Sequence, residues 1–216
     1  MAREQSAVEA LLRNVWDRAK LAVERERVQL MAAQEATLPA GQTPTAIEPW
    51  DWRFWAESVR QRTYAVDDAE VKPYFALERM VTAAFECATR LFGVTFHWQP
   101  DWPTYHPDVK AYEVRDAQTQ AVVGVFLQDN FSRPGKRSGA WMNGYRWQSR
   151  AHGMVTPIIV NNNNFNKAPA GKSTLLSFDD VRTLFHEFGH GLHGLLSNVH
   201  FERLSGTNVL RDFVEL

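Results

Sequence analysis

Hydrophobic positions near the start of the chain recur with the 3.6-residue period of an amphipathic helix. Residues 2–38 contain no Gly or Pro, so this pattern predicts one long helix. Residues 39–44 contain two prolines and a glycine, which end it. Two further helices are expected over residues 52–64 and 77–92, and Gly93 is placed to serve as a C-cap for the second. The first part of the chain is therefore expected to be helical.

After Gly93 the pattern changes to short runs of β-branched and aromatic residues, separated by turn-forming residues. These runs predict a small antiparallel sheet. Its expected strands cover residues 94–98, 109–115, 121–126, 141–147 and 157–160. Residues 161–171, which begin with four asparagines, are expected to form a loop because Asn, Gly and Pro favour turns.

A last helix is predicted to begin after Ser177, with Asp180 three residues later as the partner in a capping box. Apolar residues follow at helical spacing: Val181, Leu184, Phe188, Leu192 and Leu195. The predicted fold class is α+β and mostly α-helical, with helical segments flanking the small antiparallel sheet.

Composition excludes several classes of partner. Lys and Arg total 24 against 25 Asp and Glu among 216 residues, a net charge of −1, so no basic excess favours nucleic acid or anionic lipid. No apolar run approaches the ~20 residues of a membrane span. The single cysteine, Cys87, excludes an intrachain disulfide. The mixed-charge start differs from a signal peptide, and a cytoplasmic location is expected.

A candidate metal site lies inside the last predicted helix, in the sequence His186-Glu187-Phe188-Gly189-His190. A spacing of four residues directs both imidazoles from one helix face toward a common point, where they can bind zinc. Glu187 is rotated by about 100° from His186, so its carboxylate can stand beside a bound water without ligating the ion. The alternative is a histidine pair that is only solvated or packed in the core.

Three glycines in the same helix, Gly189, Gly191 and Gly194, are unfavourable in a helix interior, and the close approach of another group, as at a tight site, would explain them. Downstream, Asp212 and Glu215 are one helical turn apart.

Glu215 is a candidate third ligand, because two histidines and one glutamate leave a zinc coordination position for water, as in hydrolytic sites. The alternative is an exposed helix carboxylate. His193, one turn after His190, is expected beside the ligands or in the core.

Several segments together resemble the thimet-oligopeptidase family of zinc metallopeptidases. They are residues 71–75, 91–93, 105–109, 129–133, 139–142, 183–193 and 204–215. The resemblance implies that His186, His190 and Glu215 bind one Zn²⁺ per chain and that Glu187 is the general base. Within the family the segments look most like bacterial peptidyl-dipeptidases, which release dipeptides from peptide C-termini. Endopeptidases like oligopeptidase A are the runner-up.

The resemblance also implies a larger protein. Family members are several times longer, with a deep channel that admits short, unstructured peptides, and the full-length enzyme is expected to be a monomer. Residues 1–46 are interpreted as an N-terminal helix and linker, and residues 47–216 as a partial catalytic domain with every metal ligand. A catalytically incompetent zinc- or peptide-binding fragment is the alternative of another class.

Two further hypotheses concern neighbouring residues. Asp212 is a candidate hydrogen-bond partner for a ligand histidine. The strand near Gly139, Ala140 and Trp141 is expected to present backbone groups to an extended peptide.

A nucleotide-binding interpretation rests on residues 171–174, Gly-Lys-Ser-Thr, which match the end of a phosphate loop. Asn166 replaces the required earlier glycine, however, and no strand is expected immediately before the loop.

Overall fold

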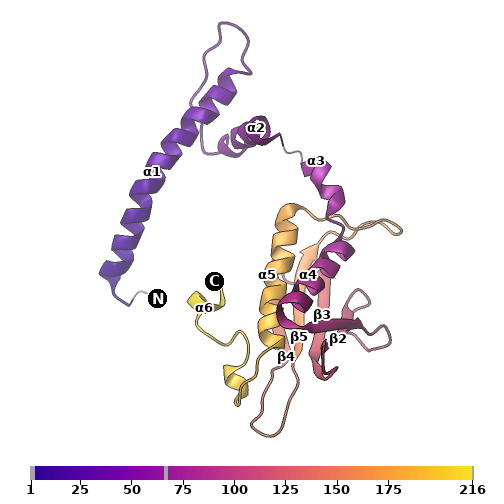
Figure 1. Cartoon of the computed structure of the whole chain (residues 1–216). Coiled ribbons are helices and arrows are strands. Elements are labelled where there is room, and N and C mark those ends of the chain that lie inside the picture. Colours follow the sequence, from indigo (N-terminus) through magenta and orange to yellow (C-terminus); the bar gives the residue numbers. More distant parts are fainter. Residues whose placement is uncertain (1–2, 66–67, 216) are drawn as a thin grey trace. The chain divides into compact units, whose positions relative to one another are not determined.

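The elements predicted from the hydrophobic pattern appear in the same order in the computed structural model, which describes residues 3–65 and 68–215 (Figure 1). Two compact units make up the chain, Met1–Glu70 and Val71–Leu216. The helices are α1 (Gln5–Glu35), α2 (Trp52–Tyr64), α3 (Asp68–Val71), α4 (Leu77–Phe92), α5 (Phe178–Leu195) and α6 (Arg211–Val214), with 3₁₀ turns η1 (Lys72–Tyr74) and η2 (Glu202–Leu204). The strands are β1 (Val94–Trp98), β2 (Lys110–Asp116), β3 (Val122–Phe131), β4 (Trp141–Arg146) and β5 (Ile158–Phe165).

The first unit contains the long helix α1, which packs against α2. The buried residues of α1 lie near its C-terminal end, at Leu30, Ala33 and Gln34. The Gln34 side-chain amide donates a hydrogen bond to Thr45 Oγ1 at 3.1 Å, which ties the following segment to the helix. The predicted long helix is confirmed, with ends three residues inside the predicted ones. The expected domain division after residue 46 stays a prediction.

In the second unit, α4 ends and α5 begins where local sequence signals predict. Gly93 ends α4 in the left-handed conformation, with φ of +65°, a backbone shape that glycine adopts without strain. At the start of α5, Ser177 Oγ accepts a hydrogen bond from the Asp180 backbone N–H at 3.1 Å, and the Asp180 carboxylate accepts one from the Ser177 N–H at 2.9 Å. The predicted capping box is confirmed.

The five strands form one mixed sheet in the order β1-β2-β3-β5-β4. Strand β5 lies between β3 and β4, parallel to β3 and antiparallel to β4. The expectation of a wholly antiparallel sheet is therefore wrong for the β3–β5 pair. Alternation of apolar and polar residues identifies strands but not their neighbours, and here the last strand enters between two earlier ones. Strand β4 is left at an edge of the sheet.

The expected loop at residues 161–166 is a second correction, because β5 continues through the asparagines to Phe165. The side-chain amides of two of these asparagines donate hydrogen bonds to residues distant in the sequence. Asn163 donates to Asn130 Oδ1 at 3.0 Å, and Asn164 donates to two backbone carbonyls of the β3–β4 connection. Because the amide nitrogens of Asn163 and Asn164 donate to distant partners, they do not compete for the neighbouring backbone as Asn does in turns, and the strand persists.

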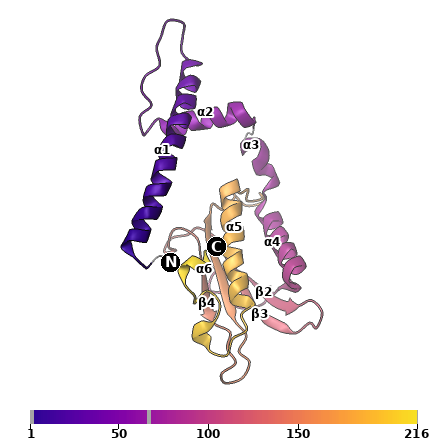
Figure 2. The ribbon, with the colours of Figure 1, turned by 60° about the vertical axis from the view of Figure 1, so that its left-hand side comes forward.

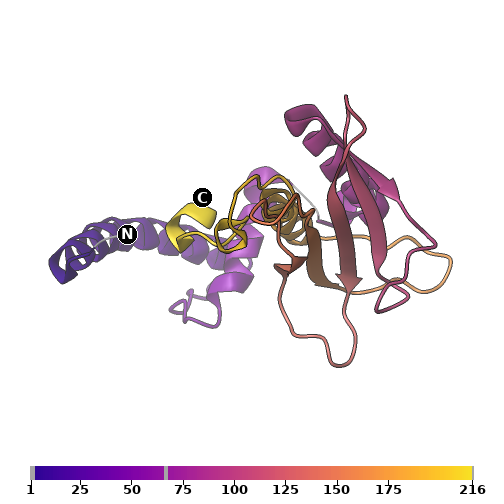
Figure 3. The same cartoon turned by 90° about the horizontal axis from the view of Figure 1, so that it is seen from below.

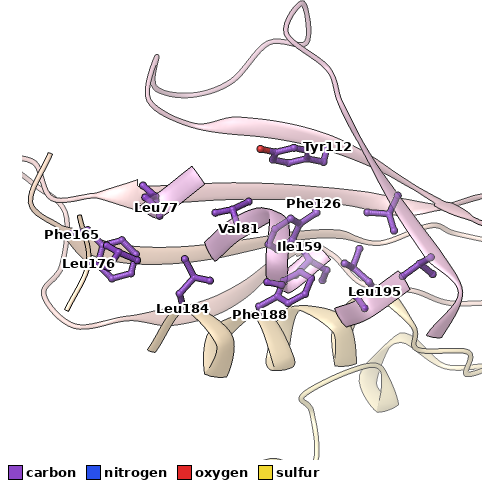
Figure 4. Packing of buried hydrophobic residues seen from close by; sticks show 14 residues of the cluster. Leu77, Val81, Tyr112, Phe126, Ile159, Phe165, Leu176, Leu184, Phe188 and Leu195 are labelled. Carbon is purple, nitrogen blue, oxygen red and sulfur yellow. The ribbon is translucent and has the colours of Figure 1, made fainter. Parts of the chain in front are cut away.

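Helices α4 and α5 cover the same face of the sheet, as the aromatic contacts show. Phe85 of α4 and Phe188 of α5 have ring centroids 5.6 Å apart, and both rings contact Phe126 of β3. Figure 3 shows α5 end-on beside the sheet, and Figure 4 shows the buried side chains between sheet and helices. The fold is thus mixed α and β, and α5 is held firmly by one apolar core.

Two of the three glycines in α5 are closely approached, as predicted, but the approaching group is strand β5 and not part of a tight site. A Cβ atom on Gly194 would lie 2.7 Å from Ile159 Cδ1, and one on Gly191 would lie 3.0 Å from Asn161 Oδ1. Both glycines therefore allow α5 to approach β5 closely. Gly189 has open space where its Cβ would be.

Candidate metal centre

Three side chains proposed as ligands from the sequence converge at one point. His186 and His190 project from one face of α5, and Glu215 directly follows α6, which lies beside α5 in Figure 2. His186 Nε2 and His190 Nε2 are 3.0 Å apart. Glu215 Oε2 is 3.4 Å from His186 Nε2 and 3.5 Å from His190 Nε2. These three residues form the single His/Cys/Asp/Glu cluster with metal-binding spacing among the described residues.

The spacing of these atoms fits zinc. In a tetrahedral site with bonds of about 2.0–2.2 Å, neighbouring ligand atoms are about 3.3–3.6 Å apart. The two distances from Glu215 to the histidines, 3.4 and 3.5 Å, lie within this range, and the 3.0 Å between the two histidine nitrogens is slightly shorter. Two imidazole nitrogens and one carboxylate oxygen are also ligands that zinc accepts, and they leave a fourth position open.

The two histidines differ in exposure. The His186 side chain is 52% exposed and that of His190 is 15% exposed. Burial is the main cause that lowers the pKa of His190, and the neighbouring His186 acts in the same direction, while Glu215 raises it. A lowered pKa favours the neutral imidazole, which is the form that binds a metal.

Glu187 is buried between α5 and the edge strand, 7% exposed. Burial is the largest cause that raises the pKa of Glu187, and the charge of Glu215 adds to it. The charge of His186 and a hydrogen bond from the Met142 backbone N–H act in the opposite direction. The carboxylate is therefore buried beside the ligand cluster, in the same cleft as Met142 of β4.

A cleft of about 240 Å³ connects the cluster to the edge strand. It is lined by Ala140, Trp141, Met142, Glu187, His190, Thr207, Val214 and Glu215. Ala140 and Trp141 of the proposed peptide-binding strand are thus in the same cleft as Glu187 and two candidate ligands. Gly139, the third residue of that proposal, precedes them with a φ of +84°.

Two residues proposed to support the ligands lie nearby. His193 is on the same side of α5 as His186 and His190, and its ring centroid is 6.4 Å from that of Phe213 on α6. Asp212 is exposed on α6, three residues before Glu215. Their roles beside the ligand histidines stay predictions.

Sequence reasoning missed Met142 and Thr207, which both line the cleft. A signal for Met142 existed, because it directly follows Trp141 in residues 139–142, one of the segments that resemble the peptidase family. Thr207 lies in the turn between η2 and α6, where no local pattern marks it as part of a cleft.

Comparison with known proteins identifies the family. The model of peptidase family M3 matches residues 1–216. The chain belongs to this family of zinc metallopeptidases.

It is 40% identical over 216 residues to the dipeptidyl carboxypeptidase of Salmonella typhimurium, covering all of this chain and 31% of that protein. Identity to the Escherichia coli dipeptidyl carboxypeptidase is 42% over 186 residues, covering 86% of this chain and 27% of that protein.

Escherichia coli oligopeptidase A is 35% identical over 219 residues, covering all of this chain and 32% of that protein. The chain therefore spans about a third of the length of these relatives. None of the helices in the described part of the chain is long and apolar enough to cross a membrane. The expected cytoplasmic location stays a prediction.

The phosphate-loop alternative is disfavoured by the structure, although one argument against it was wrong. Strand β5 does end directly before Asn166. No helix opens at Thr174, however, because α5 begins at Phe178. The Thr174 hydroxyl instead accepts a hydrogen bond from the Ala168 backbone N–H at 3.1 Å. The arrangement of loop and helix that binds phosphate is therefore not formed here.

Proposed function

We propose that this chain carries the zinc site of a peptidase that releases dipeptides from the C-termini of short peptides. The observation that carries the proposal is the spacing of the His186, His190 and Glu215 ligand atoms, which match one face of a zinc tetrahedron beside the buried Glu187. These three residues would hold one Zn²⁺. The bound ion would polarise the scissile carbonyl and lower the pKa of the attacking water.

The chain's own residues supply the remaining steps. Glu187 accepts the proton of the attacking water and returns it to the leaving amine, as a general base and then a general acid. The Glu187 carboxylate lines the same cleft as Met142 of β4. Strand β4 is at the sheet edge, so the backbone near Ala140 and Trp141 can pair with an extended peptide.

Release of dipeptides is favoured over internal cleavage by the relatives. The chain is 40–42% identical to two dipeptidyl carboxypeptidases and 35% identical to oligopeptidase A, which makes an endopeptidase like the latter the second candidate. Mass spectrometry of the products separates them. An exopeptidase removes two residues at a time from a free C-terminus, whereas an endopeptidase also cleaves the same peptide with an amidated C-terminus.

The decisive experiment compares Glu187→Gln with the unchanged chain, and with Glu202→Gln as a control at an exposed position outside the cleft. We expect one zinc per chain in all three proteins by elemental analysis. Peptide cleavage should fall at least about 100-fold only in Glu187→Gln, the scale of general acid–base catalysis.

Zinc without cleavage in the unchanged chain would instead support the alternative of a zinc- or peptide-binding fragment. Absence of zinc would contradict the ligand assignment.

A further inference from the structure

The connection between β3 and β4, residues 132–140, leads directly into the strand that lines the cleft. It carries three basic residues, Arg133, Lys136 and Arg137. A short basic run in a loop is typical of a solvated surface. In this structure each of the three cations has a partner within the second unit, so the connection is anchored along its length.

The first anchor is Asp129 at the end of β3, whose side chain is 1% exposed. Both its oxygens accept hydrogen bonds from the Arg133 guanidinium, each at 2.7 Å, and Oδ2 accepts one from the Tyr105 hydroxyl at 2.9 Å. Burial alone would raise the pKa of Asp129, but hydrogen bonds from Arg133, Lys136 and Tyr105 outweigh it and lower the pKa to about 2. Asp129 is therefore a charged, fully paired group.

The second anchor is Lys136, whose side chain is 3% exposed. Its ammonium donates to Asp129 Oδ1 at 2.9 Å, to the Asp129 carbonyl at 3.0 Å and to the Phe131 carbonyl at 2.9 Å. It also contacts the carbonyl oxygen of Asn163 on β5. One buried cation thus joins the connection to the ends of two neighbouring strands.

The third anchor is Asn164 of β5, which is closest to the cleft. Its side-chain amide donates to the Arg137 carbonyl at 2.8 Å and to the Gly139 carbonyl at 2.7 Å. The Arg137 guanidinium lies 4.7 Å from the centre of the Trp141 ring. The residues immediately before the cleft are therefore held by β5, the strand that pairs with β4.

From this geometry we infer that Asn164 and Lys136 are positioning residues for peptide binding. By fixing residues 137–139, they set where Ala140 and Trp141 present their backbone relative to Glu187 and His190. They act on the affinity for peptide, and neither zinc binding nor proton transfer depends on them. This inference rests on the proposed function, because it concerns the peptide-binding edge of the same cleft.

The test uses Asn164→Ala, which removes both donors from a partly exposed side chain and leaves the buried Asp129–Lys136 pair intact. Asn166→Ala is the matched control, because Asn166 is exposed two residues further on. Asn164→Asp is a second variant of the same shape, which places oxygen opposite the two carbonyls. Hydrogen exchange of residues 137–142, zinc content and calorimetric binding of N-acetyl-tetraalanine to zinc-loaded protein are measured for each. The binding is measured with Glu187→Gln also present in the parent and in every variant, so that the peptide is not cleaved during the titration.

We expect exchange at residues 137–142 to be about tenfold faster in both Asn164 variants, from two lost hydrogen bonds. Peptide affinity should fall about threefold to tenfold, zinc content should stay unchanged, and the control should match the parent chain. Unchanged exchange, or faster exchange with unchanged peptide affinity, would overturn the inference.

Failure of the proposed function gives a different result. A parent chain that binds the peptide without cleaving it would reject the peptidase but leave the positioning role open to the same test, whereas a parent chain that binds no peptide would reject both, whatever the exchange rates show. Binding by the parent and equally strong binding by Asn164→Ala would leave the proposed function standing and reject the positioning role alone.

Discussion

Helices α5 and α6 both carry candidate zinc ligands, but they are held very differently. Helix α5 has a capping box, buried residues along its length and two glycines against β5. Helix α6 has four residues, no side-chain cap and no buried residue. His186 and His190 are therefore preorganised by the fold, whereas Glu215 is positioned by α6, which is only weakly held.

The local contacts of Glu215 lead to the same conclusion. Its side chain is 45% exposed, and its ion pairs with His186 and His190 exist only if those rings are protonated. Exposed pairs of this kind contribute little stability. Part of the free energy of zinc binding at Glu215 is therefore offset by the cost of ordering α6.

The largest expected effect is the loss of zinc affinity when a histidine ligand of α5 is removed. The free energy of zinc binding to structural sites is about 10–16 kcal/mol for four ligands. Each ligand therefore contributes about 100- to 1,000-fold to the zinc affinity. His190→Ala, which removes a preorganised ligand, should weaken zinc binding by about 1,000-fold in a chelator competition titration. His200→Ala changes an exposed histidine outside the cluster and should have no effect.

A smaller loss of zinc affinity is expected when Glu215, the candidate ligand next to α6, is removed. Glu215→Ala should weaken zinc binding by about 30-fold, because the variant also avoids the cost of ordering α6. The same competition titration measures it, with Glu202→Gln as the control. A loss at Glu215 equal to or larger than that at His190 would show that α6 is as well ordered as α5.

Acid stability provides a third test, at a site remote from both helices. The pKa of Asp129 is lowered to about 2 in the folded chain, against about 3.9 in an unfolded one. Its stabilisation is therefore present above pH 4 and is lost as the pH falls toward 2, an effect on the order of 2 kcal/mol.

Urea unfolding between pH 7 and pH 3 should show this loss, and Asp129→Asn should remove that part of the pH dependence. An identical pH slope in both proteins would contradict the assignment. Asp101→Asn, at an exposed position, is the control.

The smallest expected effect is a difference in the free energy of unfolding between glycine substitutions on two faces of α5. Gly189 has open space at its Cβ position, so Gly189→Ala should raise the free energy of unfolding by about 0.5–1 kcal/mol through helix propensity alone. At Gly194, contact with Ile159 opposes this gain, so Gly194→Ala should be less stable than Gly189→Ala. Thermal unfolding of the two variants measures the difference, and equal stability would refute the packing role of Gly194.

Local signals explain why α4, α5 and their caps could be predicted from the sequence. The Ser177–Asp180 capping box, Gly93 and the spacing of His186 and His190 are each determined within a few neighbouring residues. The convergence of the two imidazoles follows from helix geometry alone.

Features that depend on distant partners could not be predicted in the same way. Local propensity predicts a turn at Asn164, because its hydrogen bonds to the Arg137 and Gly139 carbonyls cannot be foreseen from neighbouring residues. The pairing of β3 with β5 likewise cannot be predicted from the sequence of either strand alone. Lys136 similarly reads as solvated until Asp129 and the carbonyls of two strands surround it. Tertiary contacts decide these positions, and local propensity is a weak guide there.

The place of β5 between β3 and β4 also has a consequence for the order in which the protein folds. Strand β5 follows both neighbours along the chain, so β3 and β4 do not pair with each other as a hairpin in the folded sheet. The sheet is completed only when residues 158–165 insert, and α5, which packs on β5, can dock only then. Docking of α5, and with it the placing of the histidine pair against the sheet, therefore depends on the non-local pairing of β5 with β3 and β4.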